Sequence, residues 1–186
     1  YPPPGVPDVT ADTEKPGEEQ LVNAFSNVVN LVVLREVTPR VAALRESFGP
    51  DGGNGRQRNF LGITYARYGM YEQALEEFQA ALELGYGRAA VNTGNVAYLL
   101  GDYEAAVQWY RTAVERSPDD SLALIGLARA LYELDRFDEA DEYFRTATDV
   151  QPSLGDRYSY LSARLTGSQA RASAAAERSG DMLWNE

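Results

Sequence analysis

The chain of 186 residues contains no cysteine and no histidine. Without them it forms no disulfide and lacks thiol nucleophiles, the usual zinc ligands and the base of a Ser–His pair. Adjacent acids such as Glu76-Glu77 and Asp119-Asp120 diverge by about 100° along a helix, so they do not converge on one pocket. We interpret them as solvated charge or helix starts. We expect no metal site, no cofactor and no enzymatic activity.

Basic residues are also outnumbered by acidic ones, so the net charge is −11, and Lys15 is the only lysine. Binding to nucleic acid and to anionic membranes depends on clustered Lys and Arg, so this charge argues against both. Long apolar runs are missing as well. The most apolar run, residues 28–34, contains Asn30 and is far shorter than the ~20 residues of a membrane span. We expect neither a nucleic-acid partner nor direct membrane insertion.

A pattern of small and aromatic residues recurs three times along the middle of the chain. Each copy has a small residue, then an aromatic residue followed three positions later by alanine, then an aromatic-x-x-Ala step. The small residues are Gly62, Gly94 and Ala128, and the first alanines are Ala74, Ala106 and Ala140. These alanines are 32 and 34 residues apart, a period typical of stacked helix–turn–helix units. Small residues allow close helix crossings.

Between the two helices of each unit we expect a tight turn. The residues at these turns are Gly69, Gly101 and Asp135. Glycine adopts left-handed backbone without steric cost, and aspartate tolerates it better than most residues. We therefore predict left-handed backbone at all three positions.

The residues of each copy also carry a family resemblance. The segments GITYARYGMYEQALEEFQAAL, NVAYLLGDYEAAVQWYRTAV and ARALYELDRFDEADEYFRTAT each resemble a tetratricopeptide repeat (TPR). The resemblance implies an all-α, helical-repeat solenoid, a right-handed superhelix of antiparallel helix pairs. It covers residues 55–154, as three units at 55–86, 87–120 and 121–154. The chain departs from the family pattern at Arg58, where a large apolar residue is usual, and at Tyr86, where proline is usual.

The segment before the repeats is predicted to have two parts. Residues 1–17 contain five prolines and indicate an extended linker, with a ligand for a proline-recognising domain as the alternative. A linker implies something at its other end. We therefore expect a tethered cell-envelope or periplasmic domain, or the C-terminal domain of a larger protein, rather than a free cytoplasmic protein. Residues 18–48 are predicted to form a helical hairpin that packs on the repeats, with a turn before Thr38-Pro39.

The segment after the repeats is predicted to cap them. We expect capping helices over residues 155–179, with Tyr158, Leu161 and Leu165 turned inward to cover the last apolar face. Residues 180–186 form a tail. Trp184 in this tail either folds back onto the end helices or is an apolar tag offered to a partner.

In TPR proteins the first helix of each unit lines a concave groove, so the resemblance implies a partner-binding groove here. Its predicted lining is Asn59, Ile63, Arg67, Arg88, Val91, Asn92, Asn95, Tyr98, Leu122, Ile125, Arg129 and Tyr132. One subset of the family grips a C-terminal carboxylate with lysines, asparagines and an arginine. Only Asn92 matches that clamp, because Asn59, Ile63, Leu122 and Gly126 occupy its other positions. The clamp is absent.

The predicted lining favours a peptide ligand. An asparagine amide donates and accepts at once, tyrosine supplies apolar area, and arginine favours an acidic group on the ligand. We expect Asn92, Asn95 and Arg129 to be surface side chains on which binding depends. We therefore predict a non-catalytic protein–protein interaction scaffold that binds a protein or peptide segment in the concave groove. The alternative is a self-assembling, homo-oligomeric subunit whose groove is filled by its own N-terminal helices or by a neighbour's tail.

Overall fold

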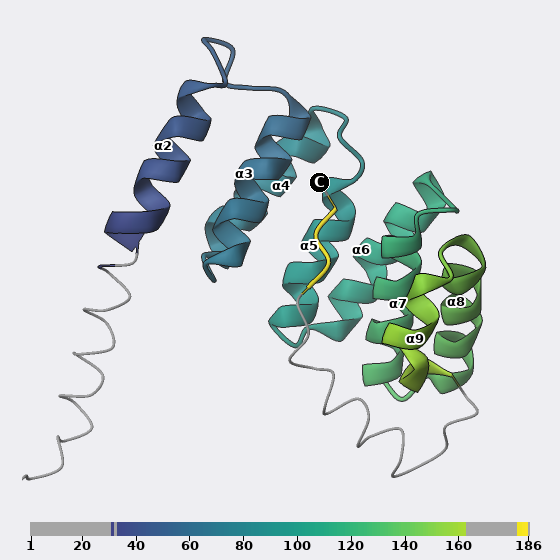
Figure 1. The fold of residues 1–186 in the computed structure, drawn as a ribbon. Helices are drawn as coiled ribbons and strands as arrows, with labels where there is room; N and C mark the ends of the chain where they lie inside the picture. Colours follow the sequence, from purple (N-terminus) through teal and green to yellow (C-terminus); the bar gives the residue numbers. More distant parts are fainter. Residues whose placement is uncertain (1–30, 32, 163–181, 186) are drawn as a thin grey trace, which may run out of the picture. The chain divides into compact units, whose positions relative to one another are not determined.

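The computed structural model describes residues 31, 33–162 and 182–185. It divides into two compact units, Tyr1–Arg40 and Val41–Glu186. The described residues are helical and contain no strand (Figure 1). The all-α architecture predicted from the sequence is therefore confirmed.

The first unit contains the π-helix η1 (Val33–Val37) and the beginning of α2 (Thr38–Glu46). The sequence predicts a turn before Thr38, but α2 begins directly after η1 ends. Pro39 lacks a backbone N–H, and its ring would clash with the carbonyl four residues earlier in a regular α-helix. A π turn is one way in which a helix accommodates such an interruption of its hydrogen bonds. The rest of the predicted hairpin lies outside the described residues.

The second unit contains three helix pairs in sequence order (Figure 1). Within each pair the two helices pack on each other, and the second helix of one pair packs on the first helix of the next. The pairs are α3 (Gly55–Arg67) with α4 (Tyr71–Glu83), α5 (Ala89–Leu99) with α6 (Tyr103–Arg116), and α7 (Ser121–Glu133) with α8 (Phe137–Val150).

Two short elements follow the third pair. They are α9 (Ser153–Arg157) and the 3-10 helix η2 (Ser159–Leu161), and both pack against α8. Tyr158 and Leu161 are buried there, as the sequence predicts for residues that cover the last apolar face. The rest of the predicted capping region, residues 163–179 with Leu165, lies outside the described residues.

The turns within the pairs have the predicted left-handed backbone. The φ angle is 72° at Gly69, 79° at Gly101 and 58° at Asp135. In all three turns the N–H of the next residue donates to the carbonyl five residues earlier at 3.0 Å, which is the long bond of a Schellman motif. Each first helix therefore ends in the same way.

Small residues of the first helices make room for aromatic rings of the second helices. A Cβ atom at Gly62 would lie 2.5 Å from the Phe78 ring, and Cβ atoms at Gly94 and Gly126 would lie 2.8 and 2.5 Å from the Tyr110 ring. Both rings have no exposed surface. The repeated pattern predicts Gly62 and Gly94 in this role, whereas Gly126 is found only in the structure.

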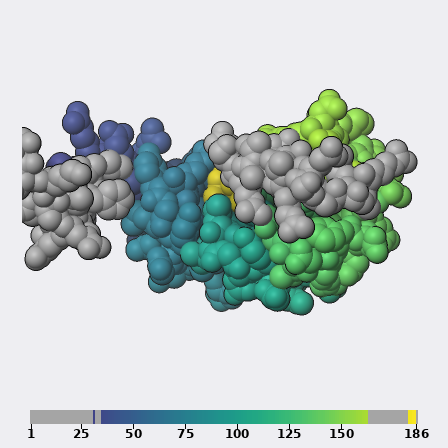
Figure 2. All heavy atoms as spheres, turned by 90° about the horizontal axis from the view of Figure 1, so that it is seen from below, coloured from purple at the N-terminus to yellow at the C-terminus, as the bar shows by residue number. Residues whose placement is uncertain are grey.

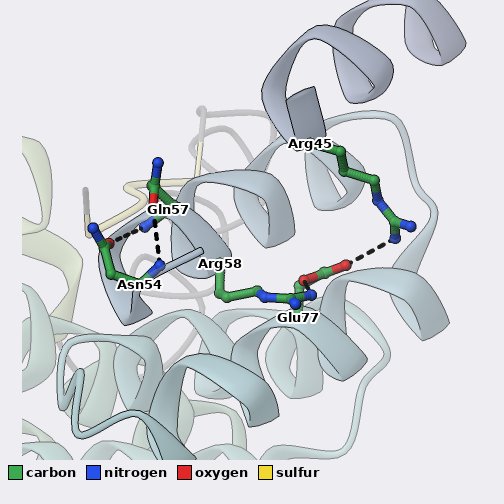
Figure 3. Close-up of polar contacts among 5 residues, drawn as sticks. All are labelled: Arg45, Asn54, Gln57, Arg58 and Glu77. Atoms are coloured by element: carbon green, nitrogen blue, oxygen red, sulfur yellow. Dashed lines mark hydrogen bonds and ion pairs between the residues drawn. The ribbon is translucent and has the colours of Figure 1, made fainter. Parts of the chain in front are cut away.

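Glu77 of α4 is not the solvated acid that the sequence suggests. It is only 5% exposed, and its carboxylate accepts from Arg45 Nη2 at 3.0 Å and from Arg58 Nη1 at 2.9 Å (Figure 3). Arg58 lies in α3, and its guanidinium lies over the Phe48 ring at 5.5 Å. The departure from the family pattern at Arg58 thus has a structural explanation, because a buried carboxylate compensates for the arginine. Its neighbour Glu76 is exposed.

Candidate partner-binding surface

Residues 182–185 lie on the surface formed by α3, α5 and α7, which we call the first-helix surface (Figure 1). Figure 2 shows part of this segment in yellow, recessed beside the first two repeats. Met182 lies near α7, and Asn185 lies near α5 and α3. The chain's own residues therefore occupy the face on which the sequence predicts a partner. Trp184 does not fold back onto the end helices.

Asn92 binds both main-chain groups of Asn185. Its Oδ1 accepts from the Asn185 N–H at 2.8 Å, and its Nδ2 donates to the Asn185 carbonyl at 2.8 Å. The same Nδ2 donates to Asn59 Oδ1 at 2.8 Å, and Asn59 Nδ2 donates to the Asn185 carbonyl at 3.0 Å. Both amide hydrogens of Asn92 are therefore in use. This arrangement holds an extended main chain and does not depend on the side chain of the bound residue.

Asn95 binds the main chain two residues earlier. Its Nδ2 donates to the Leu183 carbonyl at 2.8 Å, and its Oδ1 accepts from the Tyr110 hydroxyl at 2.7 Å. Tyr110, which reaches Asn95 from α6, therefore fixes the amide with its donor toward the segment. With residues 182–185 in place, Asn92 and Asn95 are 0% and 3% exposed, whereas the sequence predicts surface side chains open to a partner.

Two further contacts involve side chains of the segment. The Trp184 ring stacks on Phe78 with centroids 6.4 Å apart and an interplanar angle of 28°. Asn185 Nδ2 donates to Asp120 Oδ2 at 2.9 Å, while Asp120 Oδ1 caps α7 by accepting from the N–H of Leu122. Sequence reasoning missed Phe78 and Asp120 as contact residues. Phe78 nevertheless belongs to the repeated aromatic pattern, and a helix start is one of the two interpretations that the sequence allows for Asp120.

Arg129 contacts the other end of the segment. Its Nη1 lies 3.5 Å from Met182 Sδ, and its guanidinium lies 4.5 Å from the Tyr98 ring centroid and 5.6 Å from that of Tyr158. Its Nε is buried without a hydrogen-bond partner among the described residues. The faces of the two rings stabilise this cation, since an aromatic face carries partial negative charge.

The structure places the remaining predicted residues in different environments. Four are buried in the hydrophobic clusters, namely Ile63, Val91, Ile125 and Tyr132. Arg67 and Arg88 are exposed, and Leu122 is half-buried. A cavity of about 710 Å³ lies where α5 and α7 begin, and its lining includes Arg88, Val91, Leu122 and Asn185. The first-helix surface therefore continues beyond Asn185.

Two tyrosines near Arg129 give the protein an alkaline limit of stability. Burial raises the pKa of Tyr98 and Tyr110 well above the ordinary 10.0, against the opposing charge of Arg129. Both therefore keep their protons in the folded protein at a pH where the unfolded chain loses them.

We expect the free energy of unfolding to fall above pH ~10, by up to about 1.4 kcal/mol per pH unit for each tyrosine. Urea denaturation at increasing pH measures this loss, which Tyr110→Phe should reduce. An equal loss in that variant would contradict the assignment.

None of the helices in the described part of the chain is long and apolar enough to cross a membrane. The same residues contain no group of three or more acidic side chains placed to hold a metal ion.

Solved structures with a similar fold include two bacterial proteins. MamA from Desulfovibrio magneticus RS-1, residues 41 to the end, is 20% identical with a TM-score of 0.59. The alignment covers 86% of this chain and 96% of that one. PilF of Pseudomonas aeruginosa is 20% identical with a TM-score of 0.56, covering 89% and 79%. These similarities support the fold. A comparison with curated protein sequences found no significant match.

Family models agree with the repeats seen in the structure. Two models described as tetratricopeptide repeat match residues 61–121 and 97–165. Together they span more than half of the chain, and they include all three helix pairs apart from the start of α3. The chain therefore belongs to the tetratricopeptide repeat family.

Proposed function

We propose that the protein is a non-catalytic scaffold whose first-helix surface binds an extended segment of a partner protein. Tetratricopeptide repeats generally mediate protein–protein interaction, which supports a protein or peptide partner. The observation that carries the proposal is the amide contact with the chain's own main chain. Four hydrogen bonds join Asn59, Asn92 and Asn95 to main-chain groups of residues 183 and 185.

These contacts have the chemistry of a peptide site. Each net hydrogen bond contributes about 0.5–1.5 kcal/mol, so four of them supply useful affinity without any demand on sequence. The amides do not titrate and cannot act as general acids or bases. The nearby carboxylate of Asp120 is held by the cap of α7 and by Asn185. The described groups therefore favour binding over catalysis.

Peptide selection tests the proposal. We would select peptides from a random display library on the full chain carrying Trp184→Ala, which removes the ring that stacks on Phe78. Selected peptides should bind at least tenfold more weakly when Asn92→Asp is added. Aspartate keeps the size of asparagine but loses the donated N–H groups and places a charge near the bound carbonyl. Fluorescence polarisation with synthetic peptides measures the difference.

A matched control is Gln108→Glu, the same amide-to-carboxylate change at an exposed position of α6. It should leave peptide binding unchanged. Equal binding to the Asn92→Asp and Gln108→Glu variants, or a selection that yields no peptide, would refute binding at the first-helix surface.

A further inference from the structure

We propose that the first-helix surface selects a partner segment in which an aromatic residue is followed by asparagine, and that residues 182–185 compete with this segment. This inference rests on the proposed function, because it assumes that an extended partner segment binds where residues 182–185 lie. The main-chain contacts to Asn59, Asn92 and Asn95 accept any sequence. Selectivity must therefore come from side chains of the segment, and the two that meet buried or capping groups in a fixed orientation are Trp184 and Asn185. Met182 Sδ also lies 3.5 Å from Arg129 Nη1, a weaker contact that demands less of the side chain.

The first selective contact is a fixed aromatic surface. Phe78 has no exposed surface and is held beside Gly62, where a Cβ atom would lie 2.5 Å from its ring. It therefore cannot move aside, and it presents one orientation to the Trp184 ring. An aromatic pair of this kind contributes about 0.5–1.5 kcal/mol beyond the burial of its area. An aliphatic side chain at the same position would lose that contribution.

The second selective contact is a fixed hydrogen-bond acceptor. Asp120 Oδ1 accepts from the N–H groups of Leu122 and Ala123 at 3.0 and 3.2 Å, which orients the carboxylate. Its Oδ2 then accepts from Asn185 Nδ2 at 2.9 Å. A side-chain donor is required at this position, and a carboxylate there would be repelled. Asparagine supplies the donor at the correct length.

The main-chain contacts fix the register between these two contacts. Asn92 binds the N–H and carbonyl of Asn185, and Asn95 binds the Leu183 carbonyl. The residue between them is Trp184, whose side chain is the one that meets Phe78. The aromatic residue and the asparagine must therefore be adjacent. The cavity of about 710 Å³ beyond Asn185 leaves room for a partner segment to continue.

The chain's own segment is a competitor because it makes all of these contacts. A segment tethered to its binding site acts at an effective concentration that reaches the mM range for short linkers. A partner segment must therefore displace residues 182–185, and weakening them should open the site. The pair of substitutions that does so is Trp184→Ala with Asn185→Ala, which leaves the chain at full length.

The experiment uses a fluorescein-labelled peptide with the sequence DMLWNE of residues 181–186. In fluorescence polarisation it should bind the full-chain Trp184→Ala, Asn185→Ala variant at least tenfold more tightly than the parent. Peptides with Trp184→Ala or Asn185→Asp should bind the variant at least tenfold more weakly than the original peptide. When Asp120→Asn is added to the receptor, the Asn185→Asp peptide should bind more tightly than the original peptide. The new asparagine still caps α7 but now offers an amide donor to the peptide carboxylate.

The outcomes separate the two levels of the proposal. If altered and original peptides bind equally but all lose binding to a receptor with Asn92→Asp, the proposed function stands and the selectivity is refuted. If no peptide binds in any combination, both are refuted. If DMLWNE binds the parent and the variant equally, competition is refuted. Sedimentation should show the same mass for parent and variant. A dimer present only in the parent would assign residues 182–185 to a neighbouring copy and overturn competition within one chain.

Discussion

Glu77→Ala should lower the free energy of unfolding by about 2–3 kcal/mol. Breaking a fully buried ion pair costs about 3–5 kcal/mol, because a charge is left buried without its partner. The cost here is smaller, since the side chains of Arg45 and Arg58 keep 57% and 29% of their exposure. Most of the loss should arise at Arg58, whose Nε is already buried without a hydrogen-bond partner among the described residues. Urea denaturation followed by circular dichroism measures the change.

The adjacent acid provides the control for this prediction. Glu76 is exposed, so Glu76→Ala should change the free energy of unfolding by less than ~0.5 kcal/mol. A second arm replaces both partners, as Glu77→Leu with Arg58→Leu, which restores the apolar residue that the family prefers at position 58. Replacing a buried ion pair by apolar residues is often neutral or stabilising. Similar losses in all three variants would show that the ion pair does not determine the effect.

The fold could be predicted from the sequence because its determinants are local and repeated. A glycine at a turn or an alanine at a helix crossing is placed by its own unit, and three units repeat the same requirement. The left-handed backbone at Asp135 follows from its alignment with Gly69 and Gly101. Gly126 was not recognised, because it lies outside the repeated pattern and its role depends on Tyr110 of the preceding helix pair.

The occupant of the first-helix surface could not be predicted in the same way. Its contacts join Asn59 and Asn92 to Asn185, far along the chain, and nothing in a periodic pattern indicates such a pairing. The resemblance did identify the three asparagines as a group. It implies an open groove, whereas in the structure residues 183 and 185 lie on these amides. The prediction that Glu77 is solvated is wrong for a related reason. A charged side chain is usually exposed, and the two arginines that allow Glu77 to be buried lie on other helices.

Tyr110→Ala should have the largest effect, a loss of about 3–5 kcal/mol in the free energy of unfolding. The ring has no exposed surface and fills the space between Gly94 and Gly126, so its removal leaves a cavity at the junction of α5, α6 and α7. It also leaves the amide of Asn95 without the hydroxyl that orients it. Tyr110→Phe removes only that hydroxyl and should cost about 1 kcal/mol. Urea denaturation of both variants measures the two contributions separately.

Gly126→Ala tests whether the space beside this ring is the cause. In the parent a Cβ atom would lie 2.5 Å from the Tyr110 ring, so the substitution should destabilise the protein by about 1–3 kcal/mol, despite the better helix propensity of alanine. In the Tyr110→Ala background the same methyl group enters the cavity, and the helix gains about 1 kcal/mol from the loss of glycine. The substitution should then stabilise the protein. An effect of the same sign in both backgrounds would mean that the space beside the Tyr110 ring does not determine the effect of Gly126→Ala.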